Sequence, residues 1–141
     1  ADVVKSKAAE QDIIIMTAAV ADFCPSHPAD EKIKKNDSSY ESVIELERTE
    51  DILSYLGAHK AKGQLICGFS METQNMLENS KAKLAKKNAD MIVANNLKVA
   101  GAGFGTDTNV VTLITADDCT ELEIMDKSCV AARIMDRLLK M

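Results

Sequence analysis

Short apolar runs recur along this chain of 141 residues, and polar segments separate them. Three runs, at residues 13–17, 65–69 and 91–94, are apolar without alternation. Such runs are typical of strands that are covered on both faces in a parallel sheet. Two further runs, at residues 110–114 and 121–124, flank a polar stretch and predict an antiparallel hairpin.

Helical spacing of apolar residues appears between and after these strands. Val130, Ile134 and Leu138 lie four residues apart, which predicts a last helix capped by Asp126 or Ser128. A longer helix is expected from Thr73 to about residue 88, and a shorter one after Thr49, each residue serving as the N-cap. Residues 1–10 are typical of the end of a helix that has no N-cap, so we expect the N-terminal part of the fold to be missing.

The stretch at residues 23–39 contains two prolines, charged residues and Ser-Ser, and we predict a long loop there, with a short strand at 43–46. Strands that alternate with helices predict an α/β domain. We therefore expect one Rossmann-like, three-layer domain with a mostly parallel sheet and an antiparallel hairpin appendage.

Composition narrows the class of protein. The chain is 46% apolar, which suits a folded domain, and its formal net charge of −5 argues against nucleic-acid binding. No apolar run is long enough to span a bilayer. The four cysteines lack the spacing of a metal or redox motif, so we expect free thiols in the cytoplasm.

Candidate ligand-binding residues follow the first strand. Ala18 and its small neighbours lie where the carboxyl end of the strand is expected, and ligands of open α/β sheets bind beyond those ends. The alternative is tight packing of the strand against a helix. Asp22 could accept hydrogen bonds from ribose hydroxyls or hold a metal-bound water, or it could cap a turn.

Lysines supply the second group of candidates. Lys32 and Lys34 would point the same way from an extended loop, and Lys83 and Lys87 share a face of the long helix. Lysine commonly binds phosphate, although a solvated surface explains many charge runs. Phe69, at the end of the second strand, could stack on a base, but filling the core is the simpler interpretation.

Five motifs, in order, carry a family resemblance. AAVADF, KIKK, GFSMET, KAKLAKKNADMIVANN and FGTDTNVVTLI resemble phosphopantothenate–cysteine ligase, which in bacteria often forms the C-terminal part of a bifunctional coenzyme A biosynthesis flavoprotein. The resemblance implies a ligase that activates 4′-phosphopantothenate with CTP as an acyl-cytidylate. The amine of L-cysteine then displaces CMP.

The resemblance also implies roles for individual residues. Met16, Thr17 and Ala18 would line the nucleotide, Asp22 would contact its cytidine part, and Phe69 would pack beside it. Lys83 and Lys87 would bind its phosphates. Lys32, on a flap over the site, would also bind the nucleotide and would be the catalytic residue.

Cofactors and partners follow from the same resemblance. The family requires Mg²⁺, for which the sequence identifies no ligands, and FMN is expected only where a decarboxylase domain precedes the ligase. A homodimer is expected, with the hairpin at residues 110–124 as a candidate contact, and these 141 residues alone should turn over little substrate. Two alternatives stay open: the nucleotide-binding domain of an NAD- or flavin-dependent oxidoreductase, and a structural domain without enzymatic activity.

Overall fold

The computed structural model describes residues 1–32, 43–71, 75–96, 99, 102–103 and 105–141, which form two compact units. The larger unit consists of Ala1–Thr17 and Ile52–Met141, and the smaller unit is Ala18–Asp51. Lys34 and Lys35 of the KIKK motif, and the expected helix cap Thr73, lie outside the described residues.

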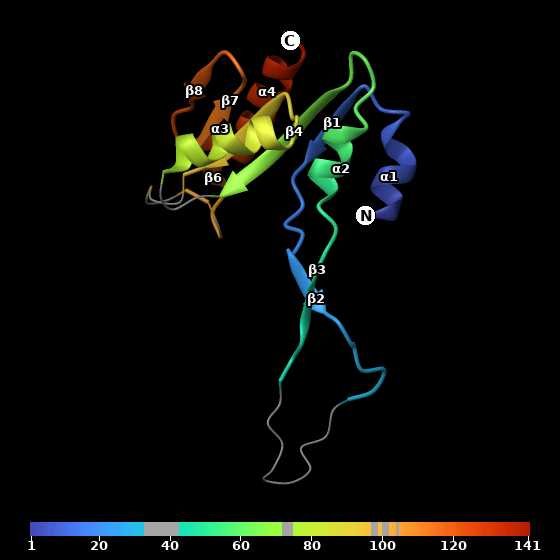
Figure 1. The fold of residues 1–141 in the computed structure, drawn as a ribbon. Helices are drawn as coiled ribbons and strands as arrows, with labels where there is room; N and C mark the ends of the chain where they lie inside the picture. The colour runs from blue at the N-terminus through green and yellow to red at the C-terminus, as the bar shows by residue number, and fades with distance from the viewer. Residues whose placement is uncertain (33–42, 72–74, 97–98, 100–101, 104) are drawn as a thin grey trace. The chain divides into compact units, whose positions relative to one another are not determined.

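A five-stranded sheet organises the larger unit (Figure 1). Its order is β1 (Ile13–Met16), β4 (Leu65–Met71), β5 (Met91–Asn95), β7 (Val111–Ile114) and β8 (Cys119–Glu121). The first three strands are parallel, and β7 and β8 are antiparallel to their neighbours. The three predicted parallel strands are confirmed. The predicted hairpin is present, and β7 joins it to the main sheet through β5.

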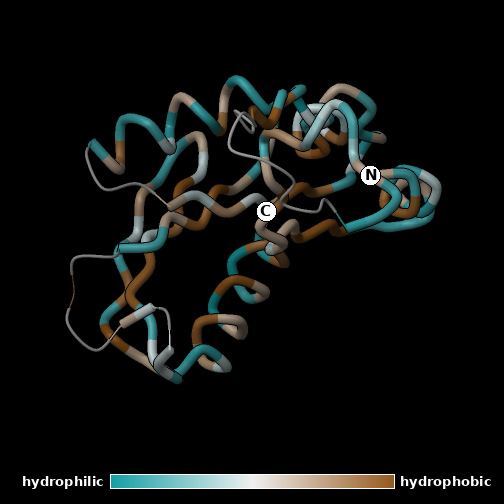
Figure 2. Tube along the Cα trace, turned by 90° about the horizontal axis from the view of Figure 1, so that it is seen from below, coloured by the Kyte–Doolittle hydropathy of each residue, from teal (hydrophilic) through white to brown (hydrophobic). Residues whose placement is uncertain are grey.

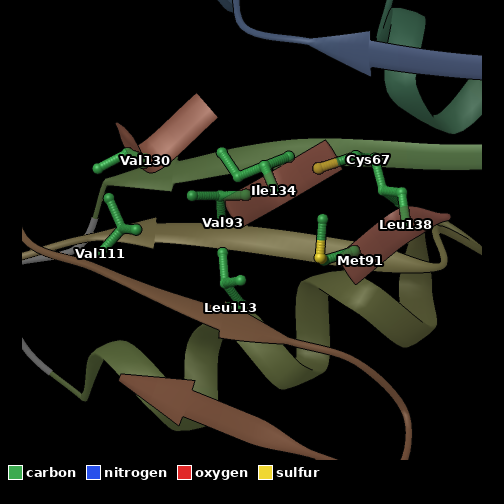
Figure 3. Close-up of a cluster of buried hydrophobic side chains, with 8 residues drawn as sticks. All are labelled: Cys67, Met91, Val93, Val111, Leu113, Val130, Ile134 and Leu138. Carbon is green, nitrogen blue, oxygen red and sulfur yellow. The ribbon is translucent and has the colours of Figure 1, made fainter. Parts of the chain in front are cut away.

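Helices cover both faces of this sheet. On one face, α4 (Lys127–Leu138) packs on a cluster of buried side chains from β4, β5 and β7 (Figure 3). The opposite face carries α1 (Asp2–Ala8), α2 (Ile52–Ala58) and α3 (Met76–Lys86). Hydrophobic and hydrophilic residues alternate around α4 (Figure 2), as expected of a helix with one buried stripe.

Close contact between α2 and α3 depends on Gly57. A Cβ atom at this position would lie 1.8 Å from the carbonyl oxygen of Lys87. The Asn88 side chain donates a hydrogen bond of 2.8 Å to the Gly57 carbonyl at the same contact. The absence of a side chain at Gly57 therefore lets the ends of the two helices approach.

The ends of the helices differ in detail from the predictions. Asn75 occupies the N-cap position of α3, in a left-handed conformation with φ 48°. Of the two predicted caps of α4, Asp126 occupies the N-cap position, without a side-chain hydrogen bond to the helix. Next to it, β6 (Thr108–Asn109) pairs with β9 (Met125–Asp126), so the start of α4 is fixed beside the segment that precedes β7.

The smaller unit contains an antiparallel pair of strands, β2 (Phe23–Pro25) and β3 (Leu46–Arg48). The prediction of a loop from residue 23 was therefore wrong at its start, and the strand predicted at 43–46 lies later, at Leu46–Arg48. Thr49 was also wrongly assigned as a helix cap. Its hydroxyl donates to the carbonyl of Ala21, while α2 begins at Ile52.

Candidate functional site

The carboxyl ends of β1, β4 and β5 meet at one edge of the sheet. Met16 pairs with Gly68, and Met71 pairs with Asn95, in the parallel ladder. In open α/β sheets this edge is where ligands bind. The edge is therefore the candidate site within the larger unit, and Met16 and the exposed Thr17 lie on it.

Two of the predicted site residues, Met16 of β1 and Phe69 of β4, belong to different faces of the sheet. Met16 packs with the cluster under α2, whereas Phe69 packs with the cluster under α4. The two side chains therefore lie on opposite faces of the sheet. Phe69 is half-buried and packs against the core cluster under α4.

Lys83 reaches the carboxyl end of β4. Its Nζ atom donates to the Phe69 carbonyl oxygen at 3.0 Å, and the side chain is half-buried. A lysine ammonium has three donors, so this bond leaves capacity for further acceptors. The structure thus holds a positive charge beside the sheet edge, on the face covered by α2 and α3.

Lys87 follows one turn later and points to α2. Its Nζ atom donates to the Ser54 hydroxyl at 3.0 Å. Both lysines are thus held by polar groups of neighbouring elements, which fits the predicted shared face of α3. These two hydrogen bonds fix the ammonium groups of Lys83 and Lys87, and so restrict the positions at which an anion could contact both.

A set of buried and half-buried polar side chains surrounds the end of β4, and the sequence alone did not single it out. The Asn95 side chain donates to the Ser70 carbonyl at 3.3 Å and accepts from Asn109 at 2.8 Å. The hydroxyls of Ser70 and Ser80 are 2.7 Å apart. The paired asparagines directly after an apolar strand, at residues 95–96, were the available signal.

The remaining predicted residues lie in the smaller unit. Ala18, Asp22 and Lys32 are all exposed. The segment from Ala18 to Asp22 is tied to Thr49, whose amide donates to the Asp22 carbonyl at 3.0 Å. The backbone of Asp22 is therefore held within this unit while its carboxylate faces solvent.

Among the residues that the structure describes, metal-ligating side chains and the buried thiol of Cys67 are further candidates for reactive groups. The described residues contain no group of three or more His, Cys, Asp and Glu side chains that could hold a metal ion. Burial, and then the carboxylate of Asp90, raise the pKa of Cys67 to about 12, so this thiol stays protonated. No helix in the described part of the chain is long and apolar enough to cross a membrane.

The curated proteins that are similar to this chain include two that share nearly half of its residues. One is the coenzyme A biosynthesis bifunctional protein CoaBC of Bacillus subtilis, 48% identical over 128 residues, which are 90% of this chain and 31% of that protein. The other, from an unknown prokaryotic organism, is named cysteine/cysteine sulfinic acid decarboxylase and is 47% identical over 131 residues, 92% of this chain and 36% of that protein. The chain thus spans about a third of these relatives.

A solved structure supports the same relationship. The crystal structure of the C-terminal domain of a CoaBC protein covers 99% of this chain and is 40% identical, with a TM-score of 0.76; the match is 61% of that protein's chain. The family model for the DNA/pantothenate metabolism flavoprotein C-terminal domain matches residues 1–141. The mixed α/β architecture is that of the CoaBC C-terminal domain, and the chain belongs to the DNA/pantothenate metabolism flavoprotein C-terminal domain family.

Proposed function

We propose that this chain forms the nucleotide-binding part of a CTP-dependent phosphopantothenate–cysteine ligase of coenzyme A biosynthesis. Lys83 carries the proposal, because its ammonium is hydrogen-bonded to the Phe69 carbonyl at the ligand-binding edge of the sheet. The name of the Bacillus subtilis relative supports the pathway.

The proposed reaction has two transfer steps. A carboxylate oxygen of 4′-phosphopantothenate attacks the α-phosphorus of CTP, and pyrophosphate leaves. The amine of L-cysteine then attacks the acyl carbon, an amide forms, and CMP leaves with the carboxylate oxygen. Both steps need stabilisation of phosphate charge more than an activated side-chain nucleophile.

Each predicted residue takes a role suited to its position. Lys83 and Lys87 contribute positive charge for the triphosphate, and Met16 and Thr17 line its approach at the end of β1. Phe69 would pack beside the nucleotide. In the smaller unit, Ala18 and Asp22 would contact the nucleotide, and Lys32 would stabilise charge during formation of the acyl-cytidylate.

Magnesium would reach this site with the nucleotide. The described residues supply no cluster of three metal-ligating side chains, so we propose no metal cage within that part of the chain. Mg²⁺ is typically held by substrate phosphates and water with one or two carboxylates. We assign no protein ligand to it and derive no step through it.

Two other activities remain to be separated from the ligase. The decarboxylase name of one relative describes a protein of which this chain covers 36%, so that activity could belong to the rest of that protein. An oxidoreductase would bind NAD or FMN, whose sites rely mainly on glycine turns and helix N-termini. The lysines of α3 favour a triphosphate instead.

Calorimetry on the complete protein that carries this chain tests the proposal. CTP with Mg²⁺ should bind, ATP, NAD and FMN should compete poorly at this site, and Lys83→Ala should weaken CTP binding about tenfold. Lys81→Ala, an exposed lysine on the same helix, is the matched control. Unchanged CTP binding in Lys83→Ala, or tighter binding of NAD or ATP than of CTP, would contradict the proposal.

Assembly and location belong to the same proposal. We expect a homodimer, in which the exposed edge strand β8 is a candidate contact, because unpaired strand edges favour pairing. The four cysteines are free thiols, as expected of a protein of the cytoplasm. Light scattering on the complete protein tests the dimer, and a monomer at high concentration would exclude it.

A further inference from the structure

Two serine hydroxyls face each other where α3 lies against β4. Ser80 is 0% exposed and Ser70 is 3% exposed, and their Oγ atoms are 2.7 Å apart. A hydroxyl pair of this kind adds little net stability, because both groups lose their hydrogen bonds to water. Two alanines would fill nearly the same volume, so packing alone is a weak explanation for the pair.

The pair lies next to the bond that holds Lys83. Ser80 precedes Lys83 by three residues on α3, and Ser70 directly follows Phe69 on β4. The contact between Ser70 and Ser80 and the bond from Lys83 to the Phe69 carbonyl therefore join the same helix to the same strand at adjacent points. A slide of α3 by one residue, about 1.5 Å, would break both.

We propose that Ser70 and Ser80 are positioning residues that set the register of α3 on β4 and thereby direct the Lys83 ammonium toward the nucleotide phosphates. This inference rests on the proposed function for its ligand. One donor of the ammonium is used by the Phe69 carbonyl, so the direction of the others follows from the position of the helix. Misplacement of a binding group by about 1 Å can cost as much as 100-fold in rate.

The main experiment separates positioning from packing. Ser70→Ala, Ser80→Ala and the double variant are made in the complete protein, with Ser6→Ala, an exposed serine of α1, as control. Each single variant leaves one buried hydroxyl unpaired, so its melting temperature should fall by several degrees, and the double variant should recover most of this loss. Affinity for CTP should be about tenfold weaker in all three variants, the double variant included.

Recovery of both properties would overturn the inference. If the double variant regains stability and also binds CTP as tightly as the wild type, the pair serves only to satisfy its own hydroxyls. If the double variant regains stability without affinity, the pair positions Lys83. Ser6→Ala should change neither property.

A second measurement needs no nucleotide. In a cycle of Ser80→Ala and Lys83→Met, the losses in melting temperature should be non-additive, because both bonds fix one register. Additive losses would overturn the inference whatever the ligand is. Failure of the wild type to bind CTP would instead count against the proposed function, and the cycle would still decide whether the two bonds act together.

Discussion

Cys67 illustrates how burial controls the chemistry of a single residue. Its thiol lies in the cluster under α4, and its pKa is raised from 9.0 to about 12, first by burial and then by the charge of Asp90. At pH 8 roughly one thiol in 10⁴ would be ionised. We predict that thiol reagents label Cys119 and Cys129 in the native protein and reach Cys67 only on unfolding. Mass spectrometry of labelled protein checks this, and native labelling of Cys67 would contradict it.

The same shift predicts a loss of stability in alkali. Between the unfolded pKa, near 9.0, and the folded value, about 12, the unfolded chain loses the thiol proton while the folded chain keeps it. The free energy of unfolding should therefore fall as pH rises through this window, by up to about 1.4 kcal/mol per pH unit from this group.

Substitution of Cys67 isolates this effect from other groups that titrate in the same range. Cys67→Ala should be less stable at neutral pH because it leaves a cavity, yet its stability should decline less steeply above pH 9. Cys129→Ala, at an exposed position, should keep the wild-type slope. Denaturant unfolding across pH 8–10 measures both, and equal slopes in all three proteins would refute the assignment.

Asp90 stabilises the fold through hydrogen bonds to two partners, the Ile66 amide and the Lys60 side chain. One carboxylate oxygen accepts from the amide of the buried Ile66 at 2.7 Å, and the other accepts from Lys60 at 2.9 Å. Asp90→Ala would leave the Ile66 amide unpaired, and we predict a loss of about 2 kcal/mol in the free energy of unfolding. Asp90→Asn keeps an acceptor and should lose less. Asp117→Ala, in an exposed turn, is the control; equal effects of all three variants would contradict the assignment.

At the scale of elements, the contact between α2 and α3 depends on one missing side chain. Gly57→Ala would place Cβ 1.8 Å from the Lys87 carbonyl oxygen, so the helices must separate. We predict a loss of about 3 kcal/mol, at the upper end for overpacking. Gly63→Ala is a matched control with a φ of 84° and open space around it, and should cost about 1 kcal/mol. Urea unfolding distinguishes them; a smaller loss for Gly57→Ala than for Gly63→Ala would contradict the contact.

The strands also show which parts of the fold the sequence pattern could predict. The three parallel strands were predictable because each is a continuous apolar run that must be buried on both faces. Strand β2 was missed and β3 was placed too early, because each has three residues, Pro25 ends one of them, and their pairing joins separate parts of the chain. Such strands form through partners that a local pattern does not reveal.

The roles of the candidate site residues stay predictions, but the structure shows where the described ones lie. Lys83 and Lys87 followed from helical spacing, and the structure places both against neighbouring polar groups. Ser70 and Ser80 could not be predicted, because a serine within an apolar strand or a helix is informative only when its partner is known. Asn95 had a local signal in the paired asparagines at 95–96, but its contacts with Ser70 and Asn109 come from different elements and have no signal in the sequence.

At the scale of the whole molecule, the proposed site residues are divided between two compact units. Lys83 belongs to the larger unit and Lys32 to the smaller one. Lys83 is held by a backbone carbonyl, whereas Lys32 is exposed. We therefore propose different roles for the two lysines. The fixed Lys83 would bind the nucleotide in the ground state, and the exposed Lys32 would stabilise negative charge that develops during the reaction.

Kinetic and binding measurements on the complete protein can separate these two roles. We predict that Lys32→Gln lowers kcat by 100-fold or more, about 2.7 kcal/mol, with little change in the Kd for CTP, because it removes charge stabilisation made mainly in the transition state. Lys83→Gln should raise the Kd for CTP about tenfold with a smaller effect on kcat. Lys62→Gln, an exposed lysine outside the proposed site, is the control. Equal losses of binding and turnover in Lys32→Gln would make Lys32 a binding residue only and would remove its proposed catalytic role.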